Sequence, residues 1–240
     1  MKKTYGTLPE WIAKQAQLGP NISVEGKQTE SNSFWYLLTV CCPLIFEQYA
    51  IVLHPFWISF DLKKSPNLEQ PKNAHNKSFE RISWPDFFTM YRYPFDLQSA
   101  NRNMELIRKR IIETGWPEDI RYPNEGNCES CELEYIFEHI KDIHGDILIN
   151  FYYCQLKTQN WEKEIIYQGH LTEFNLLQSE KEVLENPTAI YPDNKNWCIV
   201  SDYDLPFTYI GGSKTLIDRI TQNSPFDIYP IEPIFKAKNV

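Results

Sequence analysis

The sequence has no run of apolar residues long enough to cross a membrane. Its longest nearly apolar run covers residues 34–46 and is interrupted by Thr39 and Pro43, whereas a membrane-spanning helix needs about 20 apolar residues. The opening residues, MKKTYGTLPEW, contain two lysines but no apolar segment after them, so we expect no secretory signal. These absences predict a cytoplasmic protein without a membrane segment, whose apolar runs form a buried core.

Motifs of catalysis are also missing. No serine or cysteine lies in the glycine-flanked turn that carries a hydrolase nucleophile. The only Gly-Gly pair, Gly211 and Gly212, lacks the glycine spacing and the lysine position of a phosphate-binding loop. We therefore expect a protein that is not an enzyme, with no catalytic residues and no cofactor.

The six cysteines offer one metal-like motif. Cys128 and Cys131 form a CxxC followed by His139 and His144, with a gap of seven residues to His139, where a zinc finger has ~12–15. The two histidines are five residues apart, so they do not share a face of a helix. We expect two ordinary cysteines at a helix start and no bound metal, with a zinc site as the alternative. Without a secretory signal, a disulfide framework is not expected.

Acidic residues outnumber basic ones, 32 to 24, which gives a net charge of −8. The charge is uneven, because residues 1–120 hold 14 basic and 13 acidic residues and residues 121–240 hold 10 and 19. An acidic second half repels nucleic acid and attracts a basic protein partner. The alternative is a solvated acidic surface that only keeps the protein soluble.

Most helix-like patterns come before residue 145, and the pattern after it is mainly strand-like, which predicts an α+β fold in which several helices pack on a central, mostly antiparallel sheet. We expect one domain over residues 1–240, with a possible sub-division near 116–127. Expected helices cover residues 7–18, 84–91, 99–114, 130–143 and 214–221, with a helical turn at 180–185; expected strands cover 33–40, 50–53, 146–156, 164–169, 171–177, 197–201, 207–210 and 227–232. Loops are expected at 61–77, 116–126 and 187–196.

The densest local signal is the stretch WCIVSDYDLPFTYIGGS at residues 197–213. Asp202 and Asp204 lie between its two strand-like runs. On one face of a strand these two carboxylates could share a proton or a metal, whereas in a turn they would bond the backbone and close the bend. The strand that follows ends at the glycine pair, and Ser213 stands where the N-cap of a helix belongs.

A small-ligand site at this stretch is the second hypothesis. Backbone N–H groups at a glycine corner before a helix could bind an anion, although a tight strand-to-helix corner explains the same residues. His54, at the end of a buried strand, could be a functional group or a hydrogen-bonded packing residue. The site would need one pocket in which its members converge: His54, Asp202, Asp204, Gly211, Gly212 and Ser213.

The helix expected at 130–143 offers a surface for a protein partner. Leucine, isoleucine and phenylalanine residues form an apolar stripe along it, and acidic residues occupy its polar face. The expected partner-binding residues are Glu129, Glu132, Glu134, Glu138 and Asp142.

Two blocks of sequence resemble a family of bacterial cytoplasmic proteins without an assigned activity. One is FEQYAIVLHP at residues 46–55, and the other is the stretch at 197–213. Trp84 and the aromatic residues 151–153 lie between the blocks, similar to the order in that family. By type, the chain also resembles the compact acidic proteins that serve as immunity partners of bacterial toxins.

These features favour a non-enzymatic binding protein, an immunity protein that neutralises a basic toxin or effector domain by direct contact through its acidic surface. The alternative is a small-ligand-binding protein or enzyme that uses the acidic turn and the glycine corner.

Overall fold

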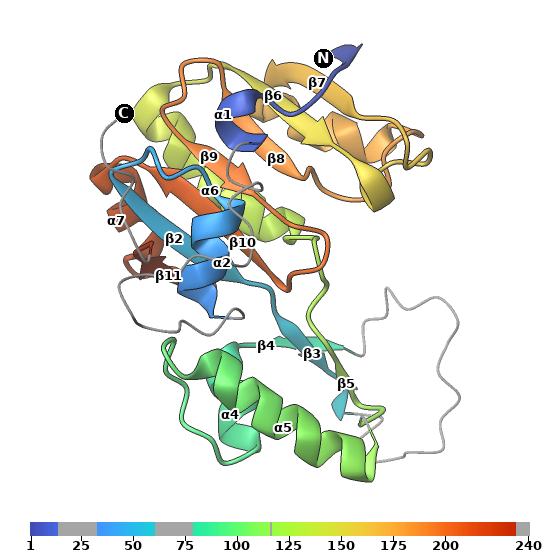
Figure 1. Ribbon diagram of the computed structural model, residues 1–240, viewed down its shortest axis with the longest axis vertical. Helices are drawn as coiled ribbons and strands as arrows, with labels where there is room; N and C mark the ends of the chain where they lie inside the picture. Colours follow the sequence, from blue (N-terminus) through green and yellow to red (C-terminus); the bar gives the residue numbers. More distant parts are fainter. Residues whose placement is uncertain (14–32, 61–78, 116, 234–240) are drawn as a thin grey trace. The chain divides into compact units, whose positions relative to one another are not determined.

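The computed structural model describes residues 1–13, 33–60, 79–115 and 117–233. The chain divides into two units, which are described separately below: unit 1 comprises Met1–His54 with Glu125–Val240, and unit 2 comprises Pro55–Asn124. Figure 1 shows the elements of both. The predicted α+β class is confirmed, while the prediction of a single domain over residues 1–240 stays a prediction. None of the described helices is long and apolar enough to cross a membrane.

An eight-stranded sheet forms the centre of unit 1. Its strands are β1 Lys2–Tyr5, β2 Gln48–Leu53, β6 Leu148–Tyr153, β7 Ile165–His170, β8 Ala189–Pro192, β9 Cys198–Val200, β10 Phe207–Gly212 and β11 Ile228–Ile231. They are arranged in the order β1-β7-β6-β8-β9-β10-β2-β11, and each neighbouring pair is antiparallel. β11 is an edge strand, a position that tolerates its Pro230 because proline cannot donate a hydrogen bond to a neighbouring strand.

Helical segments cover the sheet of unit 1. They are α1 Glu10–Ala13, α2 Phe34–Cys41, α6 Ser130–His144 and α7 Lys214–Thr221, with the 3-10 helices η2 Gln155–Lys157 and η3 Leu171–Ser179. The helices predicted at 130–143 and 214–221 are confirmed as α6 and α7. The helix predicted at 7–18 begins three residues later than predicted, as α1, and residues 14–18 lie outside the described residues.

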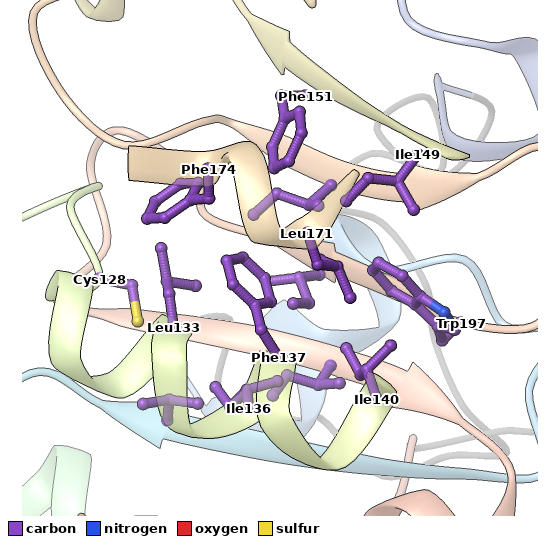
Figure 2. Packing of buried hydrophobic residues seen from close by; sticks show 14 of the residues in the cluster. Cys128, Leu133, Ile136, Phe137, Ile140, Ile149, Phe151, Leu171, Phe174 and Trp197 are labelled. Atoms are coloured by element: carbon purple, nitrogen blue, oxygen red, sulfur yellow. The ribbon is translucent and has the colours of Figure 1, made fainter. Parts of the chain in front are cut away.

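Both faces of the central strands β8, β9 and β10 are buried, and side chains along each strand alternate between these faces. In β9, Ile199 joins the core beneath α6, α7 and η3, whereas Cys198 and Val200 join a second cluster with Ile12 of α1. Figure 2 shows the larger core, where Phe137 of α6 faces residues from η3 and β6. Burial on both faces explains why these central strands consist mostly of apolar residues.

The strand predicted at 33–40 is wrong, because the segment folds as helix α2. Ser33 caps it by accepting a hydrogen bond from the Tyr36 backbone N–H at 3.2 Å. The Tyr209 hydroxyl of β10 donates to the Phe34 carbonyl oxygen at 2.6 Å, which fixes the helix on the sheet. A short apolar run is compatible with either structure, so periodicity could not separate them.

Three further predictions in unit 1 are wrong. The strand expected at 171–177 is the 3-10 helix η3, whose buried Leu171, Phe174 and Leu177 recur every three residues, the period of that helix. The helical turn expected at 180–185 is a turn followed by an isolated bridge between Thr158 and Val183. The loop expected at 187–196 contains strand β8, which its prolines and asparagines concealed.

Unit 2 combines a small sheet with two helices. Its antiparallel strands lie in the order β4-β3-β5, with β3 Phe56–Ile58, β4 Glu80–Ile82 and β5 Ile120–Arg121; its described helices include α4 Trp84–Met90 and α5 Ala100–Thr114. Ser83 caps α4, the helix predicted at 84–91, by accepting from the Asp86 backbone N–H at 3.1 Å. The rings of Phe56 and Phe87 stack with centroids 3.7 Å apart. The prediction of a loop at 116–126 is wrong in part, because this segment contains strand β5. The loop predicted at 61–77 lies outside the described residues.

Candidate functional site

Helix α6 carries the acidic residues that the sequence assigned to a partner surface. Its first turn is fixed by Glu132, whose carboxylate accepts from the Glu129 backbone N–H at 3.1 Å and from the Cys128 thiol at 3.5 Å. Glu132 is 0% exposed. The expectation that Glu132 would face a partner is therefore corrected: its carboxylate is a buried cap of α6.

Three acidic residues of α6 are exposed. Glu134, Glu138 and Asp142 are successive at intervals of four, so they lie on one face of the helix. We call these three residues the acidic row. Asp142 lies 3.9 Å from the Arg219 guanidinium of α7, a surface ion pair that leaves the carboxylate largely in solvent. The opposite face of α6 is buried against the sheet.

A groove of about 290 Å³ lies beside the acidic row, between α6 and η3. Glu134, Glu138 and Lys141 line it from α6, and Thr172 and Asn175 line it from η3. The apolar residues of its floor are Phe137, Leu171 and Phe174, each at most 6% exposed. The groove therefore combines an apolar floor with a rim on which acidic side chains outnumber basic ones by two to one.

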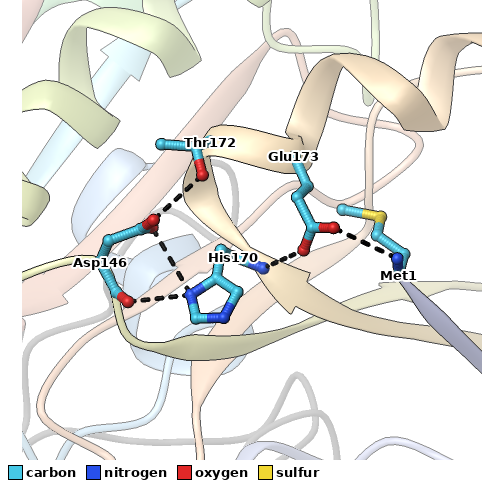
Figure 3. Close-up of polar contacts among 5 residues, drawn as sticks. All are labelled: Met1, Asp146, His170, Thr172 and Glu173. Carbon is cyan, nitrogen blue, oxygen red and sulfur yellow. Dashed lines mark hydrogen bonds and ion pairs between the residues drawn. The ribbon is translucent and has the colours of Figure 1, made fainter.

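Two sets of hydrogen bonds hold η3 in place. Near the end of η3, the Gln178 side-chain amide donates to the Ser130 hydroxyl at 3.2 Å. At the start, the Thr172 hydroxyl donates to an Asp146 carboxylate oxygen at 3.0 Å, and His170 Nδ1 lies 2.9 Å from the Asp146 carbonyl oxygen (Figure 3). Both walls of the groove are thereby tied to one another.

The same cluster anchors η3 to the sheet. Glu173 accepts from the His170 backbone N–H at 2.8 Å and from the Met1 ammonium at 3.3 Å (Figure 3). These two donors, the His170 N–H first, hold the pKa of the Glu173 carboxyl below its usual value. Glu173 thus joins η3 to β7 and to Met1, the residue before β1, and we assign it a structural role.

His54 lies in a buried polar network. Its Nε2 lies 2.9 Å from the Thr208 hydroxyl, which lies 2.7 Å from the Ser201 hydroxyl. His54 and Thr208 are 0% exposed and Ser201 is 3% exposed. This geometry favours the packing interpretation of His54, because the ring nitrogen is engaged inside the sheet rather than at a surface.

A neighbouring lysine was not anticipated from the sequence. Lys157 of η2 is 0% exposed, and its ammonium donates to the carbonyl oxygens of Pro187 at 3.2 Å and Ser201 at 3.3 Å. Burial lowers its pKa to about 8. Lysine in a polar stretch is normally exposed, so no sequence signal marked it. It ties η2 to the segments that flank β8 and β9.

Lys157 makes the stability of the fold depend on pH. Raising the pH from about 7.5 to about 9.5 is expected to raise the free energy of unfolding of the wild type by about 2 kcal/mol relative to Lys157→Met. Between its folded pKa of about 8 and its ordinary value of 10.5, the unfolded chain binds the proton that the folded chain has lost, so stability rises with pH. Urea unfolding of both proteins at the two pH values measures this difference, and equal pH slopes would contradict it.

The acidic turn is closed by its own side chain. The Asp202 carboxylate accepts from the Asp204 backbone N–H at 3.0 Å, and the Leu205 N–H donates to the Asp202 carbonyl oxygen at 3.2 Å. This is the backbone-closing arrangement that the sequence offered as an alternative to a shared proton or metal.

The glycine corner is filled by protein groups. A Cβ on Gly211 would lie 2.1 Å from Cδ2 of Phe46, so glycine is required for packing. Ser213 caps α7 by accepting from the Leu216 N–H at 3.3 Å, and the Lys214 N–H donates to the Glu47 carboxylate at 2.9 Å. A carboxylate therefore occupies the place that an anionic ligand would take.

The structure does not bring the members of the proposed ligand site together. The acidic turn and His54 lie at one end of β10, where Phe207 pairs with Leu53, and the glycine pair lies at the other end. A strand of six residues is about 17 Å long. The expected convergence of these groups in one pocket is therefore wrong.

The two cysteines of the CxxC face different surroundings. Cys128 is buried, whereas Cys131 is exposed. Burial, and then the nearby Glu132 carboxylate, raise the pKa of the Cys128 thiol well above its usual value, which disfavours the thiolate that a metal needs. Within residues 1–13, 33–60, 79–115 and 117–233, no three His, Cys, Asp or Glu side chains are grouped as metal ligands.

Comparison of the chain with protein-family models, curated proteins and solved structures found no match. The resemblances drawn from its sequence blocks therefore stay predictions, and the function is argued from the geometry of the acidic row and the groove.

Proposed function

We propose that this chain is a non-enzymatic binding protein that neutralises a basic toxin or effector domain by direct contact through the acidic row. The observation that carries the proposal is the exposure of Glu134, Glu138 and Asp142 on one face of α6. A helix fixed on a sheet presents these charges in one orientation, which favours specific binding over general solubility.

The charge of the whole unit supports a basic partner. Unit 1 holds 13 basic and 23 acidic residues, whereas unit 2 holds 11 and 9. An acidic surface of this kind accelerates encounter with a basic protein and slows it with an acidic one, and salt weakens both effects. A toxin is the concrete partner that we propose, because immunity proteins, which the chain resembles by type, act by binding without catalysis.

Charge reversal tests the acidic row. The triple variant Glu134→Lys, Glu138→Lys and Asp142→Lys is expected to slow association with a partner purified from the host by about 10- to 100-fold at low ionic strength. The matched control reverses three exposed acids of unit 2, Glu105, Glu113 and Glu118, which changes the net charge by the same amount. Stopped-flow kinetics measure both.

The two variants separate a specific surface from overall charge. If the acidic row binds the partner, the α6 variant slows association far more than the control, and added salt narrows the gap. Equal slowing by both variants would mean that only net charge matters, and unchanged rates in both would remove the acidic surface from the interaction.

A further inference from the structure

We propose that the groove between α6 and η3 holds one arginine side chain of the protein partner. The inference rests on the proposed function, and it names the chemistry that the acidic row and the groove recognise together. An arginine inserted here would be the anchor of the interface, because arginines in desolvated central pockets are frequent hot spots of protein–protein binding.

The size of the groove fits a side chain. Its volume is about 290 Å³, just below the ~300–1,000 Å³ typical of small-molecule sites. A nucleotide or a cofactor needs more room, and its phosphates would meet Glu134 and Glu138. One long side chain fits this space.

The floor of the groove suits a long side chain with an apolar stem. The rings of Phe137 and Phe174 meet edge to face, with centroids 5.1 Å apart and planes at 77°. Figure 2 shows both rings together with Leu171 between α6 and η3. An arginine can lay its methylene groups along the exposed edge of such a floor and hold its guanidinium at the acidic rim.

The rim supplies opposite charge. Glu134 and Glu138 are one helical turn apart, about 6 Å between Cβ atoms, so two carboxylates can reach one guanidinium from the same side. A guanidinium presents five N–H donors in a rigid fork, and lysine offers only a point charge. A purely apolar side chain would bury these carboxylates without a partner, at a cost in binding.

One residue of the rim opposes the proposed ligand. Lys141 also lines the groove, and its ammonium repels a second cation. Its removal should therefore strengthen binding of an arginine, whereas it would weaken binding of an acidic side chain. The sign of this effect distinguishes the two kinds of ligand.

A short peptide tests the groove on the full chain. The probe is acetyl-Gly-Arg-Gly-amide, and its control carries citrulline, which has the same shape without the charge. Titration followed by NMR is expected to give a dissociation constant on the order of 1 mM for the arginine peptide, with shifts in the Phe137 and Phe174 rings and in the Asn175 amide. The citrulline peptide is expected to bind at least about 5-fold more weakly.

Substitutions assign the effect to the groove. We expect Glu138→Gln to lower the affinity for the arginine peptide by about 3- to 10-fold, and Lys141→Gln to raise this affinity by about 2- to 3-fold. The control Glu118→Gln removes one exposed acid of unit 2 and should change nothing. Asn175→Trp, at an exposed position of η3, fills the groove without changing charge and should abolish binding.

Three results would overturn the inference: equal binding of the arginine and citrulline peptides, shifts that map away from α6 and η3, or no binding at all. Each of these would leave the proposed function standing if charge reversal of the acidic row still slowed association with the intact partner. If the arginine peptide did not bind and charge reversal did not slow association, neither the groove nor the acidic row would be the binding surface.

Discussion

Replacing Gly126 with alanine is expected to lower the free energy of unfolding by about 3 kcal/mol. Gly126 has a φ of 69°, and a Cβ there would lie 2.5 Å from the Tyr203 Cα and 3.0 Å from the Tyr203 carbonyl oxygen. Both contacts are with backbone, which cannot rotate away as a side chain can. The Gly126 N–H also donates to the Leu205 carbonyl oxygen at 2.8 Å, so the segment before α6 is held against the acidic turn.

The matched control for this substitution is Gly145→Ala. Gly145 ends α6 with a φ of 75°, and a Cβ there would meet nothing within 4 Å, so it carries the left-handed strain of about 1 kcal/mol without the clash. Urea unfolding of both variants isolates the contact with Tyr203. Equal losses would mean that the acidic turn moves freely, and that its role is not to hold the start of α6.

Replacing Glu132 with lysine is expected to destabilise the protein by about 4 kcal/mol, whereas Glu134→Lys should change stability by less than about 0.5 kcal/mol. The two residues are two positions apart on α6, but Glu132 is buried as a cap and Glu134 is exposed. Lysine at 132 would place a cation in the core and remove the acceptor of the Glu129 N–H.

Urea unfolding and circular dichroism of the two lysine variants measure this contrast. Glu132→Gln retains an oxygen acceptor, so we expect it to cost only about 1–2 kcal/mol. Similar stability of the two lysine variants would show that Glu132 is accessible to solvent, and it would return this residue to the binding surface.

Much of the fold could be predicted because its boundaries carry local signals. Ser213 marks the start of α7, and its side chain accepts a hydrogen bond as an N-cap does. Gly145 marks the end of α6 with a positive φ, which glycine favours. Helix α2 begins at the cap residue Ser33, but its apolar run of eight residues fits a strand or a helix, so the run was predicted as a strand.

Of the two walls of the groove, only the one formed by α6 could be predicted from the sequence. The spacing of Glu134 and Glu138 on a helix could be read from the sequence, but the burial of Glu132 depends on the packing of α6 against the sheet. Its signal was the pair Glu129 and Glu132 at capping-box spacing, at the very start of the helix. The opposite wall of the groove was hidden, because η3 was interpreted as a strand.

The proposed ligand site failed for a geometric reason. Asp204 and Gly211 are close in sequence, yet a strand extends by about 3.3 Å per residue, so β10 carries the two ends of this stretch apart. At one end the Asp202 carboxylate closes the turn by accepting from the Asp204 N–H, and at the other end the Glu47 carboxylate accepts from the Lys214 N–H at the start of α7.

Hydrogen–deuterium exchange of the full chain, alone and bound to the partner captured from its host, tests most directly whether the acidic row is the binding surface. We expect slower exchange on binding in α6 around Glu134 to Asp142 and in η3, with no change at residues 202–213. Protection confined to residues 202–213 or to α5, with α6 and η3 unchanged, would contradict the assignment of the binding surface.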